Sequence, residues 1–271
     1  MPISLQAAIL GVVQGLTEFL PVSSSAHLIL ARLFFGFDGD KFGLAFDVAC
    51  HVGTLIAVVA YFRSELARLV AALPRLFRPN DRDARLIWLL VIGTLPAVVA
   101  GLLFKHQIEG NLRTPAIAAA MLAAGALMFF AAEAIGSKTR PETSLTSGEA
   151  LLVGCAQAVA LVPGVSRSGA TITMALFIGL RRAEAARFIF LLAIPAILGA
   201  AASEAPKVLK AGLGDTAPLF LIGVVTSAVV GYAAVKYFIR YLGDHSLAVF
   251  AWYRLALAAA TAVWLYAMAP S

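Results

Sequence analysis

Long apolar stretches, separated by short polar or basic segments, set the pattern of this chain. Six of them, near 44–63, 86–104, 115–135, 185–203, 217–238 and 247–268, are long enough or nearly long enough to cross a bilayer. Because a transmembrane helix needs about 20 mainly apolar residues, each run predicts one membrane-spanning helix.

Two other apolar pieces, 24–35 and 166–180, are too short to cross. As helices they would measure about 18 Å and about 22 Å, against a hydrocarbon core of about 30 Å. Each follows a proline, Pro21 or Pro163, and each pairs with an apolar arm upstream. Broken helices survive at membrane depth only inside protein or beside a wet cavity. We therefore expect two re-entrant helical hairpins.

The order of these elements repeats: a hairpin and three spans, then a hairpin and three spans. A shift of 143 positions aligns Gly11 with Gly154, Gln14 with Gln157, Val22 with Val165, Ser23 with Ser166 and Ser25 with Ser168. Since three is odd, the second half is inverted relative to the first, as in many transporter folds. The sequence predicts an all-α polytopic membrane protein, one membrane domain over 1–271 made of inverted repeats of about 1–140 and 141–271.

Composition agrees with a membrane protein and suggests an orientation. The chain is 61% hydrophobic and 13% charged, whereas soluble domains carry about 25% charged residues. Six arginines lie between 63 and 85, and the loops sharing their side hold about twice as many basic residues as the opposite side. The positive-inside rule then places the 63–85 loop in the cytoplasm and both termini outside. The net charge of +6 follows from this bias and does not indicate nucleic-acid binding.

The first hairpin carries polar side chains in an apolar setting. Gln14 and Glu18 are four residues apart and share a helix face. Ser23 and Ser24 follow the Pro21 break and can cap the next helix, whose N-terminus also attracts anions. His27 lies one turn further on. Buried polar groups of this kind are functional candidates by default.

The second hairpin has a similar tip. Ser166 can cap a helix, and Gly169 allows a close backbone approach. Arg167 is the side chain best matched to phosphate oxygens, so we expect it to face either Glu18 or a phosphate. Ser168 and Thr171 add hydroxyls to the expected phosphate site. An acid, a base, hydroxyls and an arginine at two helix N-termini favour phosphoryl transfer on a lipid-borne substrate.

These segments resemble the undecaprenyl-diphosphate phosphatase family of integral membrane enzymes, known for bacitracin resistance. Gly11 to His27 matches its E/Q-x-x-x-E motif and Pro-Val-Ser-Ser-x-x-His run, and Pro163 to Thr171 matches Pro-Gly-x-Ser-Arg-Ser-x-x-Thr. Tyr253-Arg254 in the last span also matches. The resemblance implies functional roles for Glu18, Ser24, His27, Ser166, Arg167 and Thr171.

The same resemblance implies a prenyl diphosphate lipid substrate and a divalent cation, Mg²⁺ or Ca²⁺, held near Glu18 and Gln14. It further implies a multi-pass protein of the bacterial cytoplasmic membrane, and it leaves a homodimer open. The bias of basic residues in the loops predicts that the site opens to the outer face. Gln14 occupies a position often held by glutamate; it keeps an oxygen ligand but cannot act as a base. We therefore expect the acidic role to fall on Glu18.

Two mechanisms stay open at this stage. In one, Ser24 attacks the terminal phosphorus while His27 acts as base or acid. In the other, His27 or a metal activates water, and Ser24 only positions phosphate. A lipid flippase or secondary transporter is the alternative function, although polar residues cluster at the hairpin tips rather than along a pathway. We expect Asp47 and His51, on one face near a helix start, to be solvated at the interface.

Overall fold

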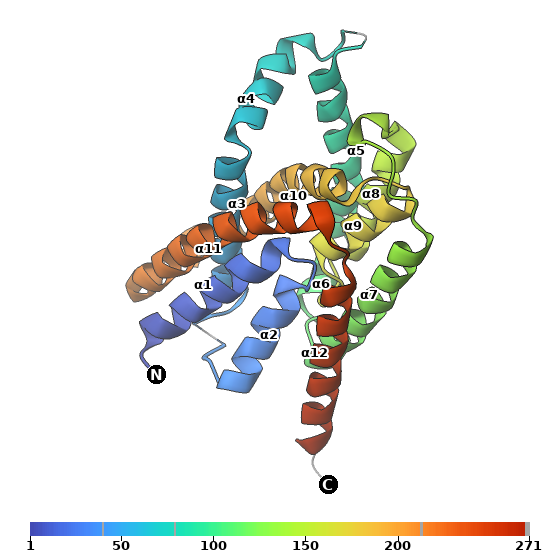
Figure 1. Ribbon diagram of the computed structural model, residues 1–271. Coiled ribbons are helices and arrows are strands. Elements are labelled where there is room, and N and C mark those ends of the chain that lie inside the picture. Colours follow the sequence, from blue (N-terminus) through green and yellow to red (C-terminus); the bar gives the residue numbers. More distant parts are fainter. Residues whose placement is uncertain (40, 79, 212–213, 269–271) are drawn as a thin grey trace.

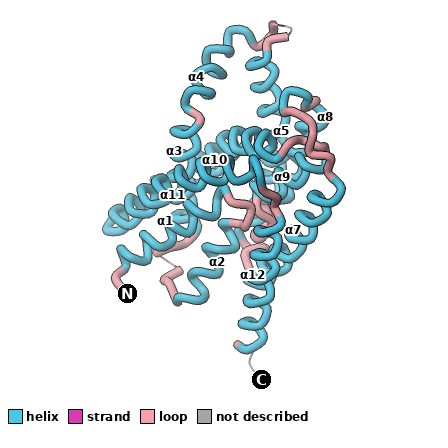
Figure 2. The backbone as a smooth tube through the Cα atoms, viewed as in Figure 1, coloured by secondary structure: helices cyan, strands magenta, loops and turns pink. Residues whose placement is uncertain are grey.

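The structure is a computed structural model that describes residues 1–39, 41–78, 80–211 and 214–268. Within these ranges the chain forms twelve α-helices and no strand, with one isolated bridge between Arg140 and Leu180 (Figures 1 and 2). The helices are α1 (Ile3–Phe19), α2 (Ser24–Phe35), α3 (Leu44–Tyr61), α4 (Arg63–Ala72), α5 (Arg82–Leu103), α6 (Lys105–Glu109), α7 (Pro115–Ile135), α8 (Ser147–Val159), α9 (Arg167–Phe177), α10 (Arg182–Ala211), α11 (Ala217–Asp244) and α12 (Ala248–Ala267).

Six of these helices are long and apolar enough to cross a membrane: α3, α5, α7, α10, α11 and α12. They confirm the six predicted spans, and the protein is a multi-pass membrane protein. The helix α5 begins four residues before the predicted apolar run because Asp81 caps it. The Asp81 carboxylate accepts hydrogen bonds from the backbone N–H groups of Asp83 and Ala84 at 3.0 and 3.1 Å.

The short helices lie where the sequence predicts hairpins. The helix α2 spans 24–35 as expected, whereas α9 starts at Arg167 and ends at Phe177, before the predicted limit of 180. It stops early because Gly179 adopts a positive φ of 94° and its carbonyl accepts the N–H groups of Thr139 and Arg140. None of α1, α2, α8 and α9 reaches 18 residues. These lengths are consistent with re-entrant hairpins.

The packing of the hairpins is reciprocal between the two halves. The helix α1 packs along α11, and α8 packs along α5. Glycine makes both contacts close: a Cβ on Gly11 would lie 2.9 Å from the Gly223 carbonyl oxygen, and one on Gly154 would lie 2.5 Å from that of Gly93. Gly11 and Gly154 correspond under the 143-residue shift, and each lies in a hairpin arm that packs on a span of the other half. This arrangement is consistent with an inverted repeat.

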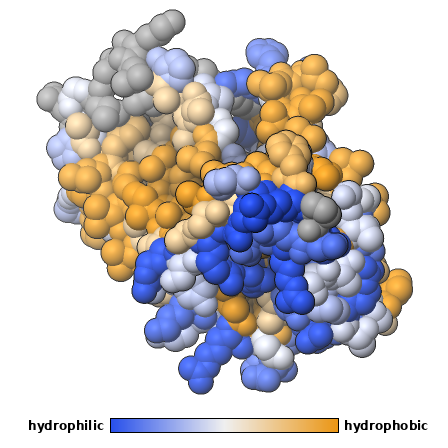
Figure 3. All heavy atoms as spheres, turned by 90° about the horizontal axis from the view of Figure 1, so that it is seen from above, coloured by the Kyte–Doolittle hydropathy of each residue, from blue (hydrophilic) through white to orange (hydrophobic). Residues whose placement is uncertain are grey.

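The 63–85 segment is more structured than a loop. After α3 the chain continues into α4, which packs on α5, and the two helices form an arch at one end of the molecule (Figure 1). The N-terminus and the end of α12 lie away from this arch, as the predicted topology requires. From above the arch, hydrophilic side chains gather on one part of the face, bordered by hydrophobic ones (Figure 3).

Candidate functional site

The site forms where the breaks of the two hairpins meet. Ser23 and Ser166 cap α2 and α9, with their hydroxyls accepting the N–H groups of Ala26 and Gly169 at 3.4 and 3.1 Å. Both serines have positive φ, 73° and 75°, which is uncommon outside glycine. The same unusual turn thus occurs at equivalent positions of the two repeats, and each turn directs a helix N-terminus toward the site.

Glu18, at the end of α1, is the centre of the site. Its carboxylate is buried, and it accepts the Ser24 hydroxyl at 2.6 Å and the Gln14 amide at 2.9 Å. Arg167 binds the other carboxylate oxygen in an ion pair. The expectation that Arg167 faces Glu18 or a phosphate is met by Glu18.

Ser24 and Arg167 are aligned by the 143-residue shift, so they would be equivalent residues of the predicted repeats. Each is the first residue of its helix, α2 or α9, and each binds one oxygen of Glu18. One carboxylate therefore joins the hydroxyl of one hairpin to the guanidinium of the other. The second segment has no carboxylate at the position that corresponds to Glu18, because residue 161 is leucine.

His51 belongs to this cluster, and the prediction of an interfacial, solvated histidine was wrong. Its Nε2 lies 3.3 Å from a Glu18 oxygen, and its Nδ1 lies 2.7 Å from the Asp47 carbonyl oxygen. Both neighbours are acceptors, so only the doubly protonated ring satisfies both contacts. The pattern that could have revealed His51 is the polar pair at 47 and 51 on an otherwise apolar span.

Asp47 is also not solvated at the interface, contrary to the prediction. It is 3% exposed and forms ion pairs with Arg32 and Arg113, the latter at 2.7 Å. A buried carboxylate needs such partners, and both arginines come from other segments of the chain. Their ion pairs hold the start of α3 beside α2 and the segment before α7.

His27 lies at the edge of the site and forms no hydrogen bond with Ser24. Its Nδ1 lies 2.8 Å from the Ser23 carbonyl oxygen and its Nε2 lies 2.7 Å from the Tyr253 hydroxyl. Because a carbonyl only accepts, Nδ1 carries the proton and Nε2 accepts from Tyr253 when the ring is neutral. The two rings also stack, with centroids 5.6 Å apart. The structure therefore places Ser24 against Glu18 and His27 against Tyr253.

Of the remaining predicted residues of the second hairpin, Ser168 joins the two hairpin tips. The Ser168 hydroxyl donates to the backbone oxygens of Glu18 and Leu20 at 3.3 and 3.1 Å. The Thr171 hydroxyl donates to the Arg167 carbonyl at 2.7 Å. At Gly169 a Cβ would lie 3.0 Å from a nitrogen of Arg254. Their predicted contacts with phosphate stay predictions.

Arg254 is a buried cation that holds both hairpin breaks. It donates to the Pro21 carbonyl of the first break at 3.2 Å and to the Gly164 and Val165 carbonyls of the second at 3.0 and 3.1 Å. Its guanidinium lies 5.0 Å from the centre of the Phe129 ring. Arg254 sits in α12, next to Tyr253, so one turn of the last helix contacts His27 and both tips.

The donor set near Glu18 fits a hard divalent cation in part. The Gln14 amide oxygen is buried and has no hydrogen-bond partner among the described residues. An amide oxygen and one carboxylate suit Mg²⁺, which is usually held by one or two carboxylates together with substrate phosphates. The described His, Cys, Asp and Glu residues form no group of three that could hold a metal by themselves. A cation here would therefore need ligands from the substrate.

The fold and the site define a polytopic helical membrane protein with a serine, a carboxylate and an arginine joined at its centre. A family model described as bacitracin resistance protein BacA matches residues 7–260. The chain belongs to this family.

Relatives match over nearly their whole length. The undecaprenyl-diphosphatase of Rubrobacter xylanophilus is 50% identical over 266 residues, which covers 96% of this chain and 98% of the relative. Those of Moorella thermoacetica and Geobacter metallireducens are each 44% identical, over 94% and 97% of this chain and 95% and 98% of the relative. The similarity therefore includes both hairpins and all six spans.

Proposed function

We propose that this protein hydrolyses undecaprenyl diphosphate to undecaprenyl phosphate and inorganic phosphate, and so recycles the carrier lipid of cell-wall synthesis. The observation that carries the proposal is the joint contact of Ser24 and Arg167 with Glu18 between two helix N-termini. Relatives that cover nearly the whole chain are named undecaprenyl-diphosphatase, which supports this substrate. The protein would act in the bacterial cytoplasmic membrane with the site open to the outer face.

In the proposed reaction, the terminal phosphate takes the place of Glu18 on Arg167. Arginine binds phosphate in a bidentate manner, and the N-termini of α2 and α9 add N–H groups to the same anion. Moving the guanidinium from carboxylate to phosphate removes one of the two cationic neighbours of Glu18, and His51 stays beside it. Glu18 then becomes able to accept the proton of the Ser24 hydroxyl, which already points at it from 2.6 Å.

Ser24 then attacks the terminal phosphorus. The Ser24 oxygen–phosphorus bond forms, the phosphoanhydride bond breaks, and undecaprenyl phosphate leaves. Water subsequently hydrolyses the phosphoserine and releases inorganic phosphate. The His27–Tyr253 pair, at the edge of the site, can transfer protons to or from water in this second step. Direct attack by water, with Ser24 only positioning phosphate, is the competing route.

A bound Mg²⁺ or Ca²⁺ would neutralise charge on the diphosphate. The residues of this chain that would hold it are Glu18 and Gln14, whose free amide oxygen faces no other donor in the described structure. His51 would keep the Glu18 carboxylate oriented while Arg167 is on the phosphate, because it contacts the same carboxylate at 3.3 Å.

An apolar groove beside the site suits the prenyl chain. It lies between α7 and α12, encloses about 620 Å³ and is lined by alanines and two leucines. Ala259 lines it, whereas Ala260, one residue further, is exposed and does not. Ala259→Phe should therefore raise KM for a long prenyl diphosphate much more than Ala260→Phe. Equal effects of the two substitutions would exclude the groove as the chain-binding surface.

The decisive experiment is phosphate release from undecaprenyl diphosphate by purified protein, with and without chelator. We expect release that chelator abolishes and added Mg²⁺ or Ca²⁺ restores. Absence of release under all conditions would refute the proposed function. Ser24→Ala and His27→Ala separate the two routes. If Ser24→Ala keeps substantial turnover while His27→Ala abolishes it, the covalent route is excluded. Trapped phosphoserine in the wild type would establish the covalent route.

A further inference from the structure

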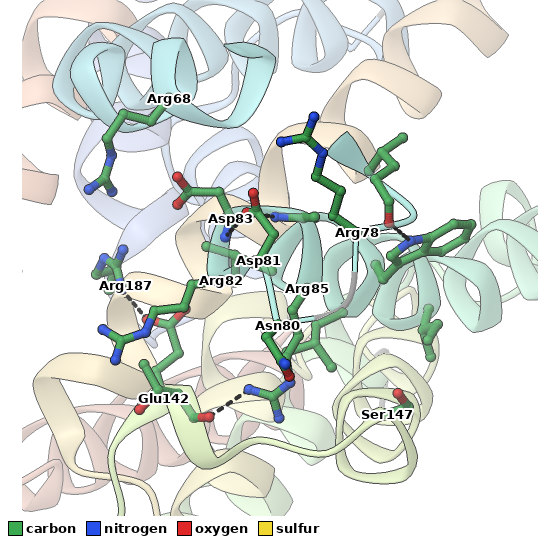
Figure 4. A pocket seen from close by; sticks show the side chains of 17 residues that line it. Arg68, Arg78, Asn80, Asp81, Arg82, Asp83, Arg85, Glu142, Ser147 and Arg187 are labelled. Carbon is green, nitrogen blue, oxygen red and sulfur yellow. Dashed lines mark hydrogen bonds and ion pairs between the residues drawn. The ribbon is translucent and has the colours of Figure 1, made fainter. Parts of the chain in front are cut away.

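A polar cavity lies beneath the α4–α5 arch (Figure 4). It encloses about 940 Å³, and its lining comes from α4, α5, α10 and the 142–147 segment. Five arginines line it, against three acidic residues: Arg68, Arg78, Arg82, Arg85 and Arg187, with Asp81, Asp83 and Glu142. The cavity therefore has an excess of positive charge.

Some of these arginines form the wall of the cavity. Arg85 donates to the backbone oxygens of Thr143 and Leu145, both at 2.6 Å, and so fastens the start of α5 to the segment before α8. Arg187 is bound by Glu65 and Glu142. Because these contacts tie separate elements together, the cavity has a defined shape.

The side chains of two other arginines form no hydrogen bond or ion pair within the part of the chain that the structure describes. They are Arg78 and Arg82, both exposed, although the Arg78 charge acts on the nearby Asp81 carboxylate. Asp81 is engaged with the N-terminus of α5, and Glu142 is engaged with Arg187. Of the acidic lining residues only Asp83 remains, so two guanidinium groups are available to an anion.

Another part of the cavity lining is apolar. Leu86, Leu89 and Ile92 of α5 line it, together with Leu76 and Trp88. The Trp88 indole N–H donates to the Leu76 carbonyl at 3.1 Å, which holds this wall in place. Tryptophan is enriched at the level of the lipid headgroups, and basic pockets between helices at that level bind anionic headgroups. The cavity thus combines a basic mouth with an apolar wall.

We propose that this cavity binds a phosphate-bearing ligand, the headgroup of an anionic phospholipid, with its phosphate in the basic part of the cavity, where Arg78 and Arg82 supply free charge, and its apolar part along α5. The bias of basic residues toward one side of the membrane explains why this end of the protein has many arginines. It does not explain why arginines from several elements line one cavity. The proposal is independent of the proposed phosphatase activity.

The test compares two double variants of the full-length protein in detergent. Arg78→Gln with Arg82→Gln removes the free charges of the cavity, and Arg63→Gln with Arg240→Gln removes two exposed charges outside it. Binding of phosphatidylglycerol, phosphatidylcholine and glycerol phosphate is measured by native mass spectrometry. We expect the wild type to prefer phosphatidylglycerol to phosphatidylcholine, and its Kd to rise about tenfold or more in the cavity variant alone.

The soluble probe distinguishes the source of the phosphate. If glycerol phosphate binds as tightly as the lipid and loses affinity in the cavity variant, the site recognises phosphate, and the ligand is a soluble phosphate. Equal weakening in both double variants would show a general charge effect and overturn the proposal. The proposal would also be overturned if the wild type bound neither phosphatidylglycerol nor glycerol phosphate.

Discussion

Replacement of Arg254 by lysine tests whether the last helix holds both hairpin tips. In the described part of the chain, Arg254 donates to five backbone oxygens, those of Leu122, Pro21, Met121, Gly164 and Val165. Its Nε and two Nη atoms spread these contacts over a planar fork. A lysine carries three N–H groups on one nitrogen and cannot reproduce that spread.

The expected loss of stability in Arg254→Lys follows from the number of buried carbonyls left without a hydrogen-bond donor. At least two of the five would lose theirs, and each unsatisfied buried group costs about 1–3 kcal/mol. Arg254→Lys should therefore destabilise the protein by about 2–6 kcal/mol, a large part of a total stability of roughly 5–15 kcal/mol. At about 2–4 °C per kcal/mol, the apparent melting temperature should fall by about 5 °C or more.

Activity should fall in the same variant, because both tips position the groups around Glu18. Misorientation of reacting groups lowers kcat more than it raises KM. The assay is a fluorescence melting curve in detergent together with phosphate release, and Arg240→Lys, an exposed position on α11, is the control. If Arg254→Lys melts within about 2 °C of the wild type and keeps its kcat, Arg254 does not hold the tips together.

Other substitutions test single contacts of the site and the loops. Arg167→Lys should lower kcat/KM for phosphate release about tenfold or more, since lysine lacks the bidentate grip, and near-normal kinetics would mean a structural role. His51→Gln should lower kcat about tenfold or more with a smaller change in KM, because Glu18 loses a cationic neighbour; an unchanged kcat would remove His51 from the site. Outside the membrane, burial and the neighbouring carboxylates raise the pKa of Glu142 to about 7, although Arg187 opposes the shift. Protonated Glu142 therefore stabilises the folded protein at low pH, and this stabilisation is lost as the pH rises from about 4.5 to 7. The melting temperature of Glu142→Gln should accordingly rise relative to that of the wild type between pH 5 and pH 8. A difference in melting temperature that stays constant over this range would contradict the prediction.

Much of the fold follows from apolar run length and from turn residues. The helices at 24–35 and 115–135 have the predicted bounds, because a serine or threonine caps each start. The helix α4 was missed because its polar composition indicates a loop, and it is helical through continuation from α3 and packing on α5. The assignment of two repeats over the whole chain stays a prediction.

The residues of the two hairpin tips were predictable, including Arg167 facing Glu18, whereas the contacts that lone polar residues of the spans make with these tips were missed. The run from Glu18 to His27 shows its chemistry in one segment. His51 reaches Glu18 from another span, and Arg254 reaches the Pro21 carbonyl across 233 positions. Neither contact leaves a local periodic pattern, so only the tertiary structure shows which lone polar residue of a span turns toward the hairpins.

The position of Arg254 in the chain has a consequence for biogenesis. Synthesis proceeds from the N-terminus, so Pro21 is made 233 residues before its donor and Gly164 90 residues before it. Unpaired carbonyls are costly in the membrane interior, so the hairpin breaks can settle at their final depth only after α12 has been inserted. A chain stopped before α12 would contain five of its six spans and both hairpins, yet it would lack the donor that brings their tips together. Completion of the site therefore waits for the insertion of α12.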